Sequence, residues 1–253
     1  MNELPEEKYS EPFNEPLINS NVSDKIKTFR NNPELVVKEM TLDDKNLENV
    51  LKRLADERKL CEDICKEYDI ATPNIYYAIG ESSKFKYDDI SIYQIKDNVH
   101  GLILSDLPPN NFNEAETIEF KEEAEKLLIT LSQYMMNTAK NGGLWLHDIF
   151  YPRQWVYGKR KGETKNKMYL IDVDDFEKYI HDPQNLDEEV MYLINLGKLV
   201  SIATMITKIE KYLGGNRLEN ARDKLIIATK EILSDSPEHK GIRMSVEEVL
   251  ARK

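Results

Sequence analysis

Carboxylate side chains follow a short apolar stretch in the segment "YLIDVDDF" at residues 169–176. In an extended chain alternate side chains point the same way, so Asp172 and Asp174 lie on one side of it. Two carboxylates so placed are suited to share a metal ion, and Mg²⁺ prefers oxygen ligands while keeping several waters. The pattern indicates a magnesium site, with solvated acids that merely cap the next helix as the alternative.

A lysine and a glutamate occupy positions where apolar residues are expected. Lys38 lies in the strand-like segment "LVVKEM", on the face that alternation shares with Val36 and Met40. Glu57 interrupts the apolar stripe of the helix that follows. A carboxylate on a buried face is costly unless it is paired, so Lys38 is its expected partner, in an ion pair suited to grip phosphate. The alternative is a snorkelling lysine and a glutamate at the edge of a solvated face.

Apolar periodicity places these residues in short strands and long helices. Strands are expected at residues 15–18, 25–29, 34–40, 71–80, 90–96 and 99–107. Helices are expected at 41–70, 114–140, near 187–213 and near 217–234, with a strand-and-loop region at 144–172. The strongest break is the Pro- and Asn-rich segment 106–116. The predicted fold class is α+β, with a small β-rich lobe containing one long helix and a larger helical lobe.

The composition is that of a soluble globular protein, with 40% hydrophobic and 32% charged residues among 253. A net charge of −11 argues against nonspecific binding to nucleic acid or to anionic membrane. The most apolar segment, 190–213, contains Lys198 and Lys208, so we expect a buried helix and no membrane span. The acidic N-terminus lacks the apolar core of a signal peptide. Cys61 and Cys65 are expected to face the core in a reducing cytoplasm.

The succession of Lys38, Glu57, a hinge, "LHD" (146–148) and "LIDVDDF" (170–176) resembles the protein-kinase-like superfamily. It is most similar to the bacterial small-molecule branches, the lipopolysaccharide (Kdo-type) kinases and the aminoglycoside phosphotransferases. The segment "EYDIATPNIYYAIG" adds to the resemblance, because these branches often place such a strand after the helix that bears the glutamate. The ordered set extends over roughly residues 17–213.

The resemblance implies a bilobal fold with these parts: an irregular arm at 1–16, an N-lobe at 17–104, a hinge at 105–109, and a helical C-lobe at 110–253 with its catalytic-loop region at 144–176. Lys38 would hold the α- and β-phosphates of ATP, with Glu57 as its ion-pair partner. Asp148 would accept the proton of the substrate hydroxyl, and Asp172 would coordinate Mg²⁺ at the β- and γ-phosphates. The hinge backbone that would face adenine comprises Ser105, Asp106 and Leu107.

The phosphate-binding loop departs from the family pattern. The family places a glycine-rich loop before the strand lysine, yet the first glycine of this chain is Gly80. The turn at 19–25, with Ser20 and Ser23, is the available substitute. Without glycine, a close approach of its backbone to phosphate is harder.

The second metal-ligand position also departs from the pattern. The family has an asparagine five residues after the catalytic aspartate, where this chain has Arg153 followed by Gln154. Either a one-residue insertion brings the Gln154 amide oxygen into the ligand role, or Arg153 supplies a positive charge there. His147, alone in an apolar loop, is expected to be structural.

The segment 157–169 is predicted to form a hairpin and carries a basic cluster, Lys159, Arg160, Lys161, Lys165 and Lys167. A solvated hairpin tip and a contact for an anionic substrate or partner are both consistent with this cluster. Only about fourteen residues separate Asp172 from the next expected helix. Such a short segment argues against a switchable kinase that docks peptides.

These features predict a kinase that uses ATP and Mg²⁺ to phosphorylate a hydroxyl of a small molecule or glycan. The runner-up is a pseudokinase that binds nucleotide or a partner protein without catalysis, so enzymatic activity is left open. A third interpretation is an unrelated α+β binding domain. The sequence names neither the acceptor nor the oligomeric state.

Overall fold

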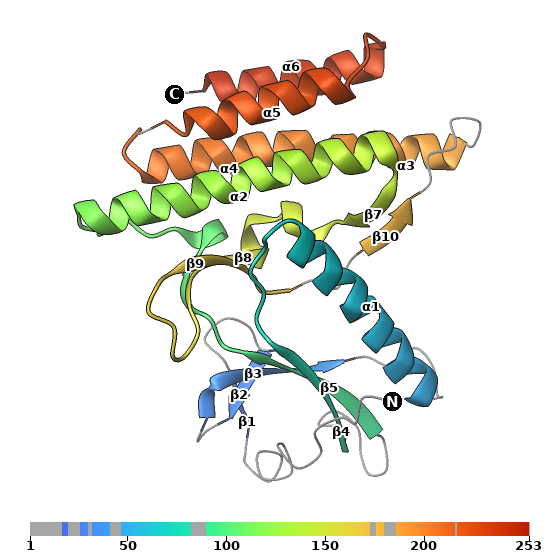
Figure 1. Ribbon diagram of the computed structural model, residues 1–253, viewed down its shortest axis with the longest axis vertical. Coiled ribbons are helices and arrows are strands. Elements are labelled where there is room, and N and C mark those ends of the chain that lie inside the picture. The colour runs from blue at the N-terminus through green and yellow to red at the C-terminus, as the bar shows by residue number, and fades with distance from the viewer. Residues whose placement is uncertain are drawn as a thin grey trace. The chain divides into compact units, whose positions relative to one another are not determined.

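Figure 1 shows the computed structural model, which describes residues 17–19, 26–29, 32–40, 47–81, 90–172, 176–179, 186–215 and 217–252. Its strands are β1 (Leu17–Asn19), β2 (Ile26–Phe29), β3 (Asn32–Met40), β4 (Ile75–Glu81), β5 (Ile90–Asp97), β6 (His100–Ile103), β7 (Gly143–Leu146), β8 (Trp155–Lys159), β9 (Lys167–Leu170) and β10 (Phe176–Tyr179). Its α-helices are α1 (Leu47–Glu67), α2 (Glu114–Asn141), α3 (Leu186–Leu196), α4 (Lys198–Tyr212), α5 (Glu219–Ile232) and α6 (Pro237–Ala251). Short 3₁₀ helices are η3 (Leu104–Asp106), η4 (Asp148–Phe150) and η5 (Pro152–Gln154). The arm 1–16, Ser20, Ser23 and Asp174 lie outside the described residues.

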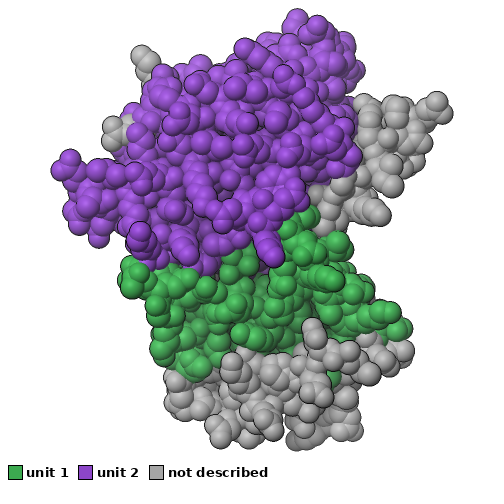
Figure 2. Space-filling view, viewed as in Figure 1, with its two compact units in different colours: residues 1–64, 72–100, 159–164 green, residues 65–71, 101–158, 165–253 purple. Residues whose placement is uncertain are grey.

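The chain divides into two compact units, coloured separately in Figure 2. Unit 1 comprises residues 1–64, 72–100 and 159–164, and unit 2 comprises residues 65–71, 101–158 and 165–253. Unit 1 holds a five-stranded sheet and most of α1, whereas unit 2 holds the other helices. The predicted α+β class is confirmed, and this content is that expected of a protein-kinase-like fold. The hinge at 105–109 stays a prediction.

The sheet of unit 1 has the strand order β1-β2-β3-β5-β4, and its neighbouring strands are antiparallel. One face buries Val37 with Ile95. The other face buries Ile92 against Val50 and Leu54 of α1. The strand β3 and the helix α1 therefore meet on one face only, where Met40 packs against Val50, Leu54 and Ile92, as two-sided strands and a one-sided helix require.

The two cysteines lie on the buried face of α1. Cys61 is 8% exposed and Cys65 is 3% exposed, and neither forms a disulfide. The expectation that they face the core is confirmed. Their i,i+4 spacing serves packing, because residues four apart lie on the same side of a helix.

The helix α2 begins with a capping box. The Asn113 side chain accepts from the Glu116 N–H at 2.9 Å, and the Glu116 carboxylate accepts from the Asn113 N–H at 2.9 Å. Farther along α2, the Phe120 ring meets Tyr157 of β8 and Tyr212 of α4 at centroid distances of 4.9 and 5.2 Å. Edge-on aromatic contacts of this kind hold β8 against the helices of unit 2.

The single helix expected near 187–213 is two helices, α3 and α4, which meet at Gly197. The Gly197 N–H donates to the Leu193 carbonyl at 3.1 Å, and a Cβ at this position would lie 3.0 Å from the Ile194 carbonyl oxygen. By length and composition alone, Val190–Tyr212 could cross a membrane, with a mean hydropathy of 1.5. In unit 2 this stretch contributes to the core, where Ile202 and Ile206 are fully buried.

A buried ion pair connects α4 to α5. Glu210 accepts from the Arg222 Nε at 2.6 Å and from the Leu218 N–H at 2.9 Å, while Arg222 also donates to the Leu250 carbonyl of α6 at 2.8 Å. Burial alone would raise the pKa of Glu210, but the hydrogen bonds and charge of Arg222 and the Leu218 N–H lower it overall. This network ties three helices together, because each polar atom of the pair has a partner on another segment.

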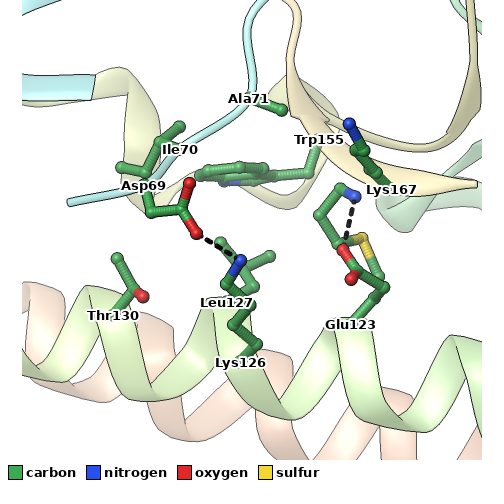
Figure 3. Close-up of a pocket in the computed structure, with 10 residues that line it drawn as sticks. Asp69, Ile70, Ala71, Glu123, Lys126, Leu127, Thr130, Trp155 and Lys167 are labelled. Atoms are coloured by element: carbon green, nitrogen blue, oxygen red, sulfur yellow. Dashed lines mark hydrogen bonds and ion pairs between the residues drawn. The ribbon is translucent and has the colours of Figure 1, made fainter. Parts of the chain in front are cut away.

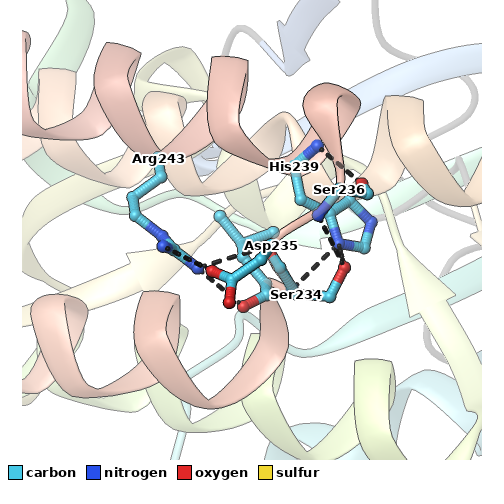
Figure 4. Close-up of polar contacts among 6 residues, drawn as sticks. Ser234, Asp235, Ser236, His239 and Arg243 are labelled. Atoms are coloured by element: carbon cyan, nitrogen blue, oxygen red, sulfur yellow. Dashed lines mark hydrogen bonds and ion pairs between the residues drawn. The ribbon is translucent and has the colours of Figure 1, made fainter.

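The link from α5 to α6 is held by its own polar contacts (Figure 4). The Ser236 hydroxyl caps α6 by accepting from the His239 N–H at 3.2 Å. The His239 Nδ1 lies 2.8 Å from the Ser234 hydroxyl, and Arg243 donates to the Leu233 carbonyl at 2.9 Å. The loop therefore fixes where α6 begins, and Leu250 at its far end is buried against unit 2.

Candidate functional site

The strand β7 delivers Asp148 to its position in unit 2. Trp145 and Leu146 of this strand are fully buried, and the Leu146 N–H donates to the Tyr134 hydroxyl of α2 at 2.9 Å. The chain then turns into η4, whose first residue is Asp148. The Trp155 indole N–H donates to the Ile149 carbonyl at 2.8 Å, so the loop after β7 is fixed on both sides.

The Asp148 carboxylate is 6% exposed and accepts a hydrogen bond from the Gln154 side chain, with 3.2 Å between Nε2 and Oδ1. Two successive 3₁₀ turns bring these residues together. The Tyr151 N–H donates to the Asp148 carbonyl at 3.0 Å, and the Gln154 N–H donates to the Tyr151 carbonyl at 2.9 Å. Since Pro152 fixes its own backbone at the start of the second turn, the sequence itself favours this geometry.

Asp172 follows the strand β9, which is paired antiparallel to β8. The Ile171 N–H donates to the Gln154 carbonyl at 2.8 Å, so the residue before Asp172 is bonded to the residue that contacts Asp148. One step earlier, the Leu170 N–H donates to the Ala71 carbonyl at 2.9 Å. Unit 2 thus connects Asp148, Gln154 and the backbone before Asp172 in one set of contacts.

By residue type, this set offers oxygen atoms of the kind that a hard cation binds. The Gln154 side chain donates to Asp148 through its Nε2, so its Oε1 keeps its capacity to accept. Asp172 comes directly after Ile171, whose N–H donates to the Gln154 carbonyl. Mg²⁺ needs only one or two protein oxygens beside waters and phosphates. Among the described residues no group of three or more His, Cys, Asp and Glu side chains could hold a metal, and Asp174 lies outside them. Gln154 and Asp172 remain the described residues that could hold Mg²⁺, as the sequence predicts.

The predicted hinge residues also lie near Gln154. Ser105 and Asp106 belong to η3, which contacts η5, and Leu104 before them is buried. The Ser105 hydroxyl donates to the Asp106 carboxylate at 3.0 Å. The Lys208 ammonium of α4 donates to the Ser105 carbonyl, so one of the backbone groups expected to face adenine already has a protein partner. Leu107, which follows η3, is half-buried.

Lys38 and Glu57 belong to unit 1. Lys38 pairs with Gln94 of β5 in the register of the sheet, on the face whose Met40 packs against α1. The Glu57 side chain is 35% exposed and lies 3.6 Å from the Arg53 guanidinium one helical turn earlier. Glu57 therefore lies at the margin of the buried face rather than within it, and its pairing with Lys38 stays a prediction.

The remaining polar residues of the catalytic-loop region have distinct surroundings. The His147 carbonyl accepts from the Phe150 N–H at 3.3 Å, and its backbone starts η4. Arg153 is exposed, and its guanidinium carbon lies 5.2 Å from the centre of the Tyr151 ring. In the hairpin formed by β8 and β9, Arg160 of the predicted basic cluster forms an ion pair with Glu163 at 3.0 Å, so its charge is offset by a neighbouring carboxylate.

The sequence interpretation missed Lys198. Its ammonium, at the first residue of α4, donates to the Tyr151 hydroxyl at 2.9 Å and lies 4.4 Å from the ring centre. The signal that could have found it was the lysine inside the most apolar segment of the chain. A charged residue in such a segment needs a specific partner, and Tyr151 next to Asp148 provides it.

Figure 3 shows a separate pocket of ≈ 310 Å³ in unit 2. Asp69 and Lys126 at its edge are joined by a 2.6 Å hydrogen bond, and the bond and charge of Lys126 hold the pKa of Asp69 below its usual value. Trp155 and Met168 line it from the hairpin. None of the described residues predicted to act as base, metal ligand, hinge or phosphate-binding pair lines this pocket.

Comparison with known proteins adds little to this picture. No protein-family model and no curated protein sequence matches the chain. Among the solved structures that match is WaaP in complex with acyl carrier protein, at 11% identity and a TM-score of 0.40. The match covers 93% of this chain and 88% of that chain.

Proposed function

We propose that this protein is a kinase-like phosphotransferase that moves the γ-phosphate of ATP to a hydroxyl group of a small molecule or glycan in the cytoplasm. One observation carries the proposal: Asp148, Gln154 and the backbone before Asp172 are linked by hydrogen bonds within one unit. By residue type, Asp148 can serve as a general base and Gln154 and Asp172 as metal ligands, in the chain order that the sequence resemblance implies. Phosphoryl transfer needs little else besides positioning and charge neutralisation.

The roles follow from residue type and chain order and, for Asp148, also from its surroundings. Asp148 is buried and oriented by Gln154, as a base that must meet a hydroxyl at a fixed place should be. Gln154 and Asp172 would hold Mg²⁺, whose charge offsets that of the nucleotide phosphates. Lys38 of β3, with Glu57 of the following helix, would hold the α- and β-phosphates, as the strand lysine and helix glutamate do in protein kinases.

Thermal unfolding with and without ATP and Mg²⁺ tests the proposal. The midpoint of the wild-type protein should rise when ATP and Mg²⁺ are present together, because a ligand that binds only the folded state stabilises it. At a ligand concentration of 100 times the dissociation constant, the gain is about 2.7 kcal/mol. The Lys38→Ala variant should lose most of the rise, and Lys52→Ala, an exposed lysine of α1, should keep it.

The absence of any Mg²⁺-dependent rise at saturating ATP would contradict the proposal. A rise that Lys38→Ala retains in full would remove Lys38 from the nucleotide site while leaving nucleotide binding itself in place.

A pseudokinase is the second candidate, and one contact favours it. The Ser105 carbonyl in the proposed hinge is engaged by Lys208, so nucleotide recognition there competes with a charged partner. A pseudokinase would show no turnover of γ-labelled ATP, whether or not it binds the nucleotide. The measurement is made at an ATP concentration that would saturate any binding. Measurable turnover that depends on Asp148 would exclude it.

A further inference from the structure

Two cations flank the Tyr151 side chain beside the candidate catalytic residues. The Lys198 ammonium lies 2.9 Å from the Tyr151 hydroxyl and 4.4 Å from the ring centre. The Arg153 guanidinium carbon lies 5.2 Å from the same ring centre. Lys198 comes from α4 and Arg153 from η5, so two segments distant in sequence supply positive charge to one aromatic side chain.

Neither cation has a carboxylate within 4.0 Å among the described residues of the chain. Other cations of unit 2 do have one: Lys126 pairs with Asp69, and Arg222 pairs with Glu210. The contrast is informative in a chain with a net charge of −11. Lys198 is also half-buried, and a desolvated ammonium is stabilised by a nearby anion.

The backbone of Tyr151 belongs to the same loop as the proposed base. Its N–H donates to the Asp148 carbonyl at 3.0 Å, and its own carbonyl accepts from the Gln154 N–H at 2.9 Å. Tyr151 is therefore fixed between the proposed base and a proposed metal ligand. Cations aimed at transferring phosphate, or at an anionic group near it, are a common feature of phosphoryl-transfer sites.

We propose that Lys198 and Arg153 form an anion-binding subsite at Tyr151, in the loop that carries Asp148, which takes a phosphate or carboxylate group. The role of this subsite in phosphoryl transfer rests on the proposed function, whereas its ability to bind an anion does not. The anion has two possible sources, the γ-phosphate of the nucleotide and an acidic group carried by the acceptor. Both groups carry oxygen atoms that would accept hydrogen bonds from these cations, since Arg and Lys side chains both bind oxyanions through charge-assisted hydrogen bonds.

Isothermal titration calorimetry separates the sources. The titrations measure dissociation constants for ATP and ADP with Mg²⁺, and for inorganic phosphate with and without ADP and Mg²⁺. The proteins are the wild type, Lys198→Met, Arg153→Gln and, as a matched control, Lys211→Met, an exposed lysine of the same helix. Losing a charge-assisted hydrogen bond should weaken binding of the relevant anion by about 10- to 100-fold.

Two results support the subsite. If Lys198→Met weakens the binding of ATP but not that of ADP, the anion is the γ-phosphate. If it leaves the affinities for both nucleotides unchanged and weakens the binding of inorganic phosphate, the anion belongs to the acceptor. Phosphate binding that depends on Lys198 in a protein that binds no nucleotide would support the subsite while contradicting the proposed function.

The opposite result is equally clear. If Lys198→Met and Arg153→Gln change every one of these affinities no more than Lys211→Met does, the subsite is refuted, even where ATP and Mg²⁺ bind as proposed. The Tyr151→Phe variant is a further check, because it keeps the aromatic ring and removes the hydroxyl that accepts from Lys198. It should weaken the binding of the same anion, but less than Lys198→Met does. An unchanged affinity in Tyr151→Phe alone would refute the positioning role of its hydroxyl.

Discussion

Asp148→Asn should lower the turnover number for phosphoryl transfer from ATP by about 10²- to 10⁴-fold, the range associated with loss of a general base. The affinity for ATP with Mg²⁺ should change little. Asparagine has the shape of aspartate and keeps an oxygen that can accept from Gln154, so the loop should stay in place. What the variant lacks is the ability to take a proton from the attacking hydroxyl.

Release of labelled phosphate from γ-labelled ATP, to water or to a hydroxyl acceptor, provides the measurement. The rate at saturating ATP and Mg²⁺ reports turnover, and calorimetry on the same variant reports nucleotide affinity. The control is Asp69→Asn, because Asp69 is an exposed carboxylate at the edge of the separate pocket. An Asp148→Asn protein that keeps the wild-type rate would show that Asp148 is not the base.

Arg222→Met should lower the free energy of unfolding by about 3–5 kcal/mol, the typical cost of removing one partner from a buried ion pair. Glu210 and Arg222 are only 6% and 8% exposed, so water does not compensate the carboxylate that the variant leaves behind. The Leu250 carbonyl would lose its donor as well. Urea unfolding at neutral pH measures the loss, and Glu210→Leu combined with Arg222→Met should recover much of it, because both charges are then gone.

The same pair gives a prediction for acid. The pKa of Glu210 is lowered in the folded protein, so its stabilising contribution is present above the pKa of the unfolded chain and is lost as the pH falls through the folded pKa. Wild-type stability should therefore fall more steeply in acid than that of the double variant. Equal acid sensitivity of the two proteins, or an Arg222→Met protein as stable as the wild type, would contradict the assigned role of the pair.

Much of the fold follows from periodicity in the sequence. The alternation in β3 and the one-sided stripe of α1 predict a sheet covered by a helix, and Met40, Ile92 and Leu54 confirm it. The capping residue Asn113 marks the start of α2 within one residue of the expected helix. Gly197 was missed as the end of α3, because the apolar pattern continues unchanged on both sides of it.

The site was less accessible from the sequence than the fold. Gln154 was a candidate by residue type, and the contact of its side chain with Asp148 depends on two 3₁₀ turns that no simple pattern predicts. Lys198 lies 47 residues from Tyr151, so their contact arises only from the packing of α4 against the loop. Glu57 was expected on a buried face, yet it lies at the margin of that face. Long-range contacts between charged residues are set by tertiary packing, which local patterns do not encode.

The proposed function requires that Gln154 and Asp172 hold Mg²⁺ for a bound nucleotide. Calorimetric titration of ATP into the wild type and into Asp172→Asn, each with Mg²⁺ and with a chelator, tests it most directly. We predict that Mg²⁺ tightens ATP binding by the wild type and that Asp172→Asn loses this dependence while keeping the weaker, metal-free affinity. The same dependence on Mg²⁺ in both proteins, or no ATP binding by the wild type, would contradict the claim.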